Sequence, residues 1–170
     1  GRRCIVLDAF MDWPLAGCKG LQVLEYGTWT WFGEPGATPP GLLKDIVRRF
    51  GAYPVPDHSR LTSVPADLVG FRDKLVAGVA KKAEVTRWLM REQPWDMLFV
   101  TFAEPHGAGH YLWHAEDRHY PSHPAGGVPG MATPIRDVFV AVDRAVGDIL
   151  SAVDDRTTVL VASGDGMGPN

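Results

Sequence analysis

The chain has 170 residues and a mass of 18.6 kDa, with 45% of the residues hydrophobic, which predicts one folded domain or part of a larger one. Its 17 basic and 20 acidic side chains give a net charge of −3, so it has no electrostatic footprint for nucleic acid or for an anionic membrane. No apolar run reaches the roughly 18 residues of a spanning helix and no signal segment is visible, so we expect a cytoplasmic protein. We expect Cys4 and Cys18 to be free thiols.

The first third of the chain alternates short apolar runs with loops. Strands are predicted at Arg3–Leu7 and at Leu21–Tyr26, where β-branched and other apolar residues cluster. The stretch 27–41 is rich in Gly and Pro and is predicted to be a loop. A short helix is expected over Leu42–Phe50, and Gly51 stands where helices end.

Longer helical patterns follow in the rest of the chain. Apolar residues at steps of three to five predict a helix within Ala66–Glu92, although two glycines weaken it. The run Asp96–Phe102 is apolar nearly throughout and predicts a strand buried on both faces. A His- and Gly-rich loop is expected over Ala103–Ala132. Thr133 is a good N-cap for the next helix, which continues to Val153.

The last predicted element is a strand at Thr157–Ala162, before the glycine-rich end of the chain. Long helices that alternate with apolar strands predict an α/β fold, namely a doubly wound, largely parallel sheet with helices on both faces. In such sheets ligands bind beyond the carboxyl ends of the strands. Two stretches that contain His, Glu or Asp side chains stand at such ends.

The first stretch follows the strand at Asp96–Phe102. Glu104, His106 and His110 lie within seven residues, and imidazole together with carboxylate suits zinc, manganese or iron. His110 and His114 are four residues apart, so a short helix here would place them on one face. A polar surface loop that binds nothing is the alternative interpretation.

The second stretch is Ser163-Gly164-Asp165-Gly166-Met167-Gly168, after the last predicted strand. Asp165 is able to ligate a metal, and the flanking glycines allow close backbone approach. Gly-Asp-Gly is also ordinary turn chemistry. The two stretches together predict one site if their strands are neighbours in the sheet. No nucleotide-binding glycine loop and no hydrolase triad is found.

Both stretches resemble metal-binding elements of the alkaline phosphatase superfamily. The segment Phe99–Trp113 resembles its Asp-x-x-x-His element, and Val159–Gly168 resembles the Ser-Asp-His-Gly-Met segment of the type I phosphodiesterase/nucleotide pyrophosphatase group. Residues 20–29 are similar to a segment that these proteins carry before a substrate-facing loop. The resemblance implies a doubly wound α/β fold with a two-metal site, most commonly of zinc, that hydrolyses phosphoric esters.

The resemblance also implies which residues hold the metal. His110 matches the family's His ligand, while His106 stands where the family has Asp. Gly164 stands where Asp is expected and Asp165 where His is expected. We therefore take His106, His110 and Asp165 as metal ligands, with Glu104 as a further ligand or as a residue that orients them.

Some residues of the family's active site have no counterpart in residues 1–170, and this determines what activity we expect of the chain. The family's nucleophile and first metal-binding Asp would precede Arg3, and its last His ligand would follow Asn170. Residues 1–170 are thus expected to be one partial domain, inactive alone, of an enzyme that acts on a small-molecule phosphoester. A sulfatase or a phosphomutase of the same superfamily is an alternative, as is a degenerate, non-catalytic binding module. Oligomeric state is not readable from the sequence.

Overall fold

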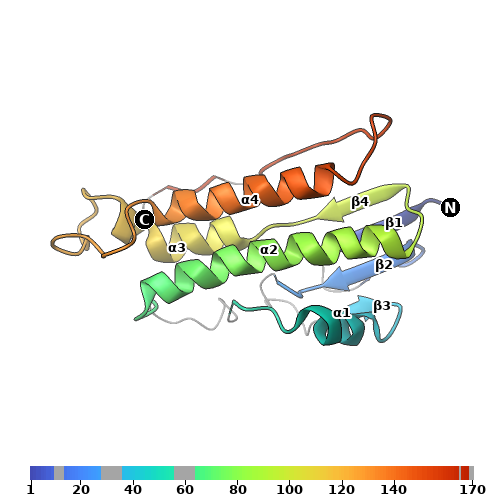
Figure 1. Cartoon of the computed structure of the whole chain (residues 1–170), viewed down its shortest axis with the longest axis horizontal. Coiled ribbons are helices and arrows are strands. Elements are labelled where there is room, and N and C mark those ends of the chain that lie inside the picture. The colour runs from blue at the N-terminus through green and yellow to red at the C-terminus, as the bar shows by residue number, and fades with distance from the viewer. Residues whose placement is uncertain (10–13, 28–35, 56–63, 165, 169–170) are drawn as a thin grey trace.

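The computed structural model describes residues 1–9, 14–27, 36–55, 64–164 and 166–168. Its strands are β1 (Arg3–Leu7), β2 (Lys19–Leu24), β3 (Gly36–Thr38) and β4 (Met97–Val100). Its helices are α1 (Leu42–Phe50), α2 (Leu68–Glu92), α3 (Glu104–Glu116) and α4 (Pro134–Leu150). The fold is therefore mixed α/β (Figure 1).

The four strands form one sheet in the order β3-β2-β1-β4. β1 lies in the centre and pairs in parallel with both β2 and β4, whereas β3 is antiparallel to β2. At the start of β4, the backbone amide of Asp96 donates to the carbonyl of Arg3 at 2.9 Å, and the Arg3 guanidinium pairs with the Asp96 carboxylate. The sheet is largely parallel, as predicted.

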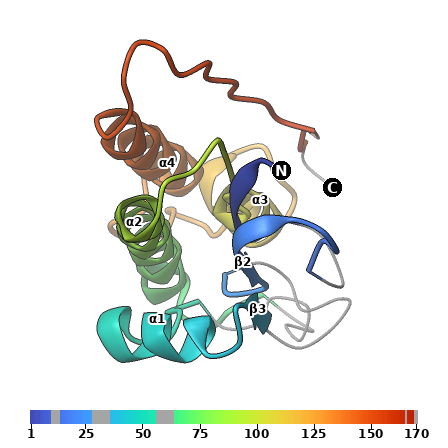
Figure 2. The same ribbon diagram turned by 90° about the vertical axis from the view of Figure 1, so that its right-hand side faces the viewer.

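Helices α1, α2 and α4 lie on the same side of this sheet, with α4 beside α2 (Figure 2). Ile5, Leu7 and Val23 of the sheet pack against Ile46 of α1 and Leu89 of α2 in the first core. A second core joins α2, α3 and α4 through Leu75, Leu112 and Val138. Among the described residues no helix covers the opposite face of the sheet, so the doubly wound arrangement is not established here.

The predicted helices are confirmed where local end signals are strong. α1 has the expected bounds, and the amide of Gly51, at φ 79°, donates to the carbonyl of Val47 at 2.8 Å. α2 begins after Asp67, whose side chain accepts a hydrogen bond from the amide of Gly70. At the start of α4 the side chain of Thr133 makes no capping bond. The Glu116 carboxylate accepts from the amide of Ile135 in its place.

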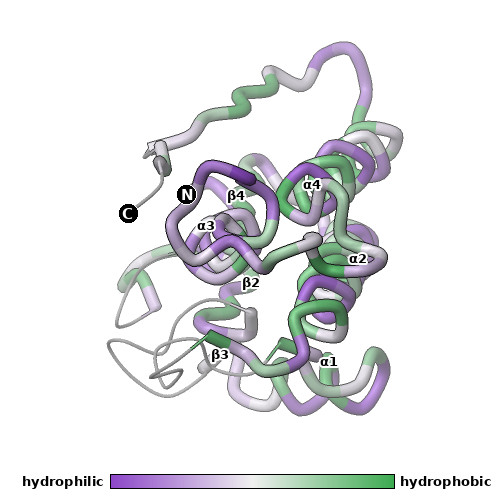
Figure 3. Tube along the Cα trace, turned by 90° about the vertical axis from the view of Figure 1, so that its left-hand side faces the viewer, coloured by the Kyte–Doolittle hydropathy of each residue, from purple (hydrophilic) through white to green (hydrophobic). Residues whose placement is uncertain are grey.

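Four sequence predictions are corrected. The stretch Glu104–Glu116 is a helix and not a loop, and Gly36–Thr38 is a short strand within the predicted loop. β4 is not buried on both faces: Met97 and Phe99 are about half exposed, because no helix among the described residues covers the face on which they lie. The segment Thr157–Ala162 is not a strand: it runs clear of the sheet, with Leu160 87% exposed (Figure 3). In the described part of the chain, no helix has the length and apolar character that crossing a membrane requires.

Candidate functional site

The carboxyl ends of β1 and β4 bring together polar side chains that are far apart in the sequence. Asp8 follows β1 with a left-handed backbone, φ 58°, which Asp tolerates better than most residues. Its carboxylate accepts from the amides of Tyr26 and Gly27, at 2.8 and 2.9 Å, and so joins the end of β1 to the end of β2. Glu104 follows β4 and opens α3. Both carboxylates are fully buried.

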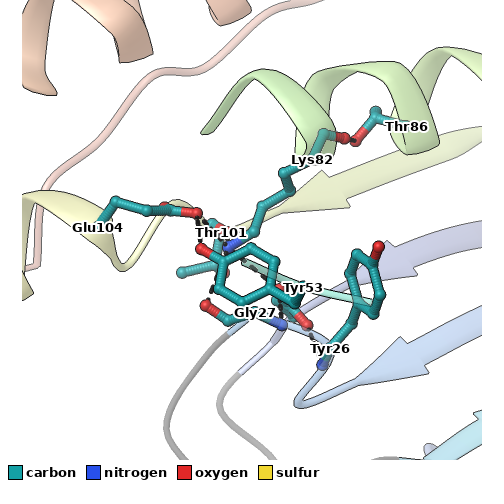
Figure 4. A network of polar contacts seen from close by, with 8 residues as sticks. Tyr26, Gly27, Tyr53, Lys82, Thr86, Thr101 and Glu104 are labelled. Carbon is teal, nitrogen blue, oxygen red and sulfur yellow. Dashed lines mark hydrogen bonds and ion pairs between the residues drawn. The ribbon is translucent and has the colours of Figure 1, made fainter. Parts of the chain in front are cut away.

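Lys82 of α2 lies between these two carboxylates. Its Nζ is 3.0 Å from Asp8 Oδ2 and 3.2 Å from Glu104 Oε1, and it donates to the carbonyl of Thr101 at 2.9 Å (Figure 4). All three side chains have no exposed surface. Because a buried charge is costly unless it is paired, this network fixes α2 against both strand ends.

Tyr53 completes the network and explains a glycine in the helix opposite. Its hydroxyl donates to Glu104 Oε1. A Cβ on Gly78 of α2 would lie 2.6 Å from the Tyr53 hydroxyl, closer than real Cβ atoms approach. Gly78, which weakens the helical pattern of the sequence, thus makes room for this hydroxyl. Glu104 Oε2 has no hydrogen-bond partner among the residues that the structure describes.

The electrostatics of the network favour a charged lysine and a neutral tyrosine. Burial alone lowers the pKa of Lys82, but the charges of Glu104 and Asp8 outweigh it, and the pKa is raised above its usual value. Burial, and after it the charge of Glu104, raises the pKa of Tyr53 far above that of free tyrosine. Burial and Asp8 raise the pKa of Tyr26 to about 12.

The two histidines of the first stretch meet on α3. His106 and His110 are one helical turn apart, and their Nε2 atoms lie 2.8 Å from each other. Two imidazole nitrogens that each bind one tetrahedral zinc at about 2.0–2.1 Å are separated by about 3.3 Å. The observed 2.8 Å is the length of a hydrogen bond between the two rings, so a shared ion would require the rings to turn apart and direct both nitrogens toward it.

The remaining predicted ligands have different surroundings. Glu104 is directed into the network with Lys82 and Tyr53. Asp165 lies outside the described residues. Across the described ranges, no three His, Cys, Asp or Glu side chains gather in a group suited to a metal ion. Of the predicted ligands that the structure describes, only His106 and His110 come together.

The second stretch nevertheless lies against the first. Met167 packs on α3 beside Gly109, where a Cβ would lie only 2.5 Å from the Met167 sulfur. Gly109 immediately precedes His110. The structure therefore places Met167, of the second stretch, next to the histidine-bearing helix.

Sequence reasoning missed Asp8, Lys82 and Tyr53 as parts of this region. A signal for Lys82 was present: it falls between Val79 and Thr86 on the stripe of α2 that faces the protein interior, a position where lysine is rare unless it is paired. The partners of Lys82 were not readable, because they come from distant parts of the chain.

Comparison with known proteins identifies the family. No curated protein and no solved structure matches the chain. The family model named type I phosphodiesterase / nucleotide pyrophosphatase matches residues 24–170, which include both of the stretches that the sequence singles out, so the chain belongs to this family.

Proposed function

We propose that the protein is a hydrolase of phosphoric esters, of the phosphodiesterase or nucleotide pyrophosphatase type, that depends on a divalent metal. The observation that carries the proposal is the pair of histidine nitrogens 2.8 Å apart on α3. Met167 of the second stretch packs on the same helix at Gly109. Membership of the family supports the same reaction class. The substrate is a small-molecule phosphoester.

In this proposal His106, His110 and Asp165 hold the metal, with zinc as the first choice and manganese as the second. Their imidazole and carboxylate groups suit both ions. When bound, the metal supplies charge neutralisation at the phosphoryl group and at the leaving oxygen. Glu104 orients the ligands: paired with Lys82, it fixes the first turn of α3, from which His106 projects.

Although Thr157–Ala162 lies clear of the sheet in this structure, we also propose that the segment is able to move onto the free edge of β4 as a fifth, parallel strand. Crossover connections between parallel strands are right-handed. Two such connections whose helices lie on the same face of a sheet therefore move the chain along the sheet in the same direction. The connection through α2 leads from β2 past β1 to β4. The connection through α4, on the same face, then leads beyond β4. The segment runs in the same direction as the β4 arrow (Figure 1), and this pairing would extend the parallel part of the sheet by one strand.

The nucleophile is proposed to lie outside this chain, as the family resemblance implies. Residues 1–170 would then bind metal without turning over substrate, and the intact gene product would be the active form. A non-catalytic binding module is the second candidate, favoured by His106 and Gly164 at positions where the family has Asp.

Calorimetric titration with Zn²⁺ and Mn²⁺ tests the proposal. We expect the chain to bind zinc and a His106→Ala/His110→Ala variant to lose that binding. His119→Ala, which removes an exposed histidine beyond the end of α3, should bind like the parent. Metal-dependent hydrolysis of a phosphodiester by the intact gene product would complete the case. Absence of zinc binding both in this chain and in the intact protein would instead favour the binding module.

A further inference from the structure

A cavity of about 330 Å³ opens beside His110. This volume is at the lower end of the range of about 300 to 1,000 Å³ typical of small-molecule sites. Its lining combines aromatic rings, imidazoles and two hydroxyls. The residues are Val64, Gly109, His110, Trp113, His114, Tyr120 and Ser122. None of them is acidic, so the cavity suits a neutral or anionic ligand.

One face of α3 forms the floor of this cavity. Gly109, His110, Trp113 and His114 follow one another at helical spacing, whereas Ala108, Leu112 and Ala115 on the other face are buried in the second core or against it. Because α3 is held from behind by that core, the floor is rigid. The half-buried indole of Trp113 offers a flat apolar surface one helical turn from His110.

The segment after α3 forms the opposite wall, and hydrogen bonds fix its path. The amide of Asp117 donates to the carbonyl of Trp113, and the amide of Tyr120 donates to that of Asp117, both at 2.9 Å. The His123 ring nitrogen lies 2.9 Å from the carbonyl of His114. These bonds hold Tyr120 in the wall of the cavity before any ligand arrives, which lowers the entropic cost of binding.

We propose that this cavity binds a planar aromatic group of the phosphoester, with its ring against Trp113 and Tyr120. The inference rests on the proposed function, because it is His110 that would place the phosphoryl group at the mouth of the cavity. An ester with an aromatic substituent next to phosphorus is then preferred over one with a small alkyl substituent. Discrimination comes from ring burial and stacking, and not from the phosphoryl group that both esters share.

Two non-hydrolysable probes test the proposal on the chain itself. Phenylphosphonate and methylphosphonate share one head group and differ in the ring. Each is titrated with and without Zn²⁺ while the Trp113 indole N–H is followed by NMR. We expect phenylphosphonate to bind about tenfold more tightly and to shift that indole signal. In Trp113→Leu the preference should vanish, whereas Trp113→Phe, which keeps a ring, should retain part of it.

Trp95→Leu is the matched control, because Trp95 precedes β4 and packs on the first core. It should keep the full preference. Equal affinity for the two probes, or a preference that survives Trp113→Leu, would overturn the aromatic pocket. If zinc strengthens both probes equally without a phenyl preference, the metal site stands and the pocket fails. If the phenyl preference holds and zinc adds nothing, the pocket stands and the metal-dependent function fails.

Discussion

At the scale of single residues, Lys82 joins the carboxyl ends of β1 and β4 through its ion pairs with Asp8 and Glu104. Its ammonium group is the only cation in the described structure that pairs with the buried carboxylates of Asp8 and Glu104. Replacing it with Met would keep the length of the side chain but leave two carboxylates buried without a counter-charge. We expect Lys82→Met to lower the free energy of unfolding by about 3–5 kcal/mol, as measured by urea denaturation.

Lys74→Met is the control for this prediction, because Lys74 is on the same helix and exposed. It should change the free energy of unfolding by less than about 0.5 kcal/mol. Equal effects of the two substitutions would show that the buried network contributes nothing specific. None of these partners was predictable from spacing: Lys82 lies 74 positions from Asp8 and 22 from Glu104, so only the folded chain reveals the pairing.

At the scale of elements, two helical glycines differ in what surrounds them. A Cβ on Gly147 of α4 would meet no other atom within 4 Å, whereas one on Gly109 of α3 would meet the sulfur of Met167. Gly147→Ala should therefore stabilise the protein by about 0.5–1 kcal/mol through helix propensity alone. Gly109→Ala should gain less or destabilise, because it displaces Met167. Urea denaturation measures both changes.

A double variant separates propensity from contact. In a Met167→Ala background the obstacle is gone, and Gly109→Ala should then stabilise about as much as Gly147→Ala does. If Gly109→Ala has the same effect with and without Met167, the end of the chain does not pack on α3. That result would also remove the support which this contact gives to a joint metal site.

The elements also show what governs prediction from sequence. β1 and α1 have their predicted bounds, because β-branched residues and a terminal glycine act locally. α3 was predicted as a loop because the stretch is rich in glycine, and Gly107 and Gly109 are poor helix formers. Packing of Ala108 and Leu112 on the second core overrides that preference. His106 and His110 were predicted together as ligands, whereas the option of a short helix was considered only for His110 and His114.

At the scale of the whole molecule, the free edge of β4 decides how far the sheet extends. The amide of Asp96 donates to β1, so by alternation the amides of Met97 and Phe99 point away from β1. If Thr157–Ala162 pairs there, these two amides should exchange with solvent slowly. We expect slow exchange in the parent chain and fast exchange in Leu160→Lys, measured by hydrogen exchange NMR.

Leu15→Lys provides the comparison, since Leu15 is also exposed but precedes β2. It should leave the exchange of Met97 and Phe99 unchanged. Fast exchange of both amides in the parent chain would mean that the fifth strand does not form. The sequence predicted the strand from its apolar run, and the exposure of Val159, Leu160 and Val161 shows why such a run needs a partner strand.

The central position of β1 has a consequence for the order of events during synthesis. Of the four strands β1 is made before the others, yet its hydrogen bond to the start of β4 joins residues 93 positions apart. β1 therefore leaves the ribosome long before its neighbour β4 exists. The edge of β1 that later pairs with β4 stays open through the synthesis of α1 and α2. Such distant pairings are slow to form, and the waiting edge is open to wrong partners. β1 is accordingly the strand of this sheet that a chaperone would have most reason to shield.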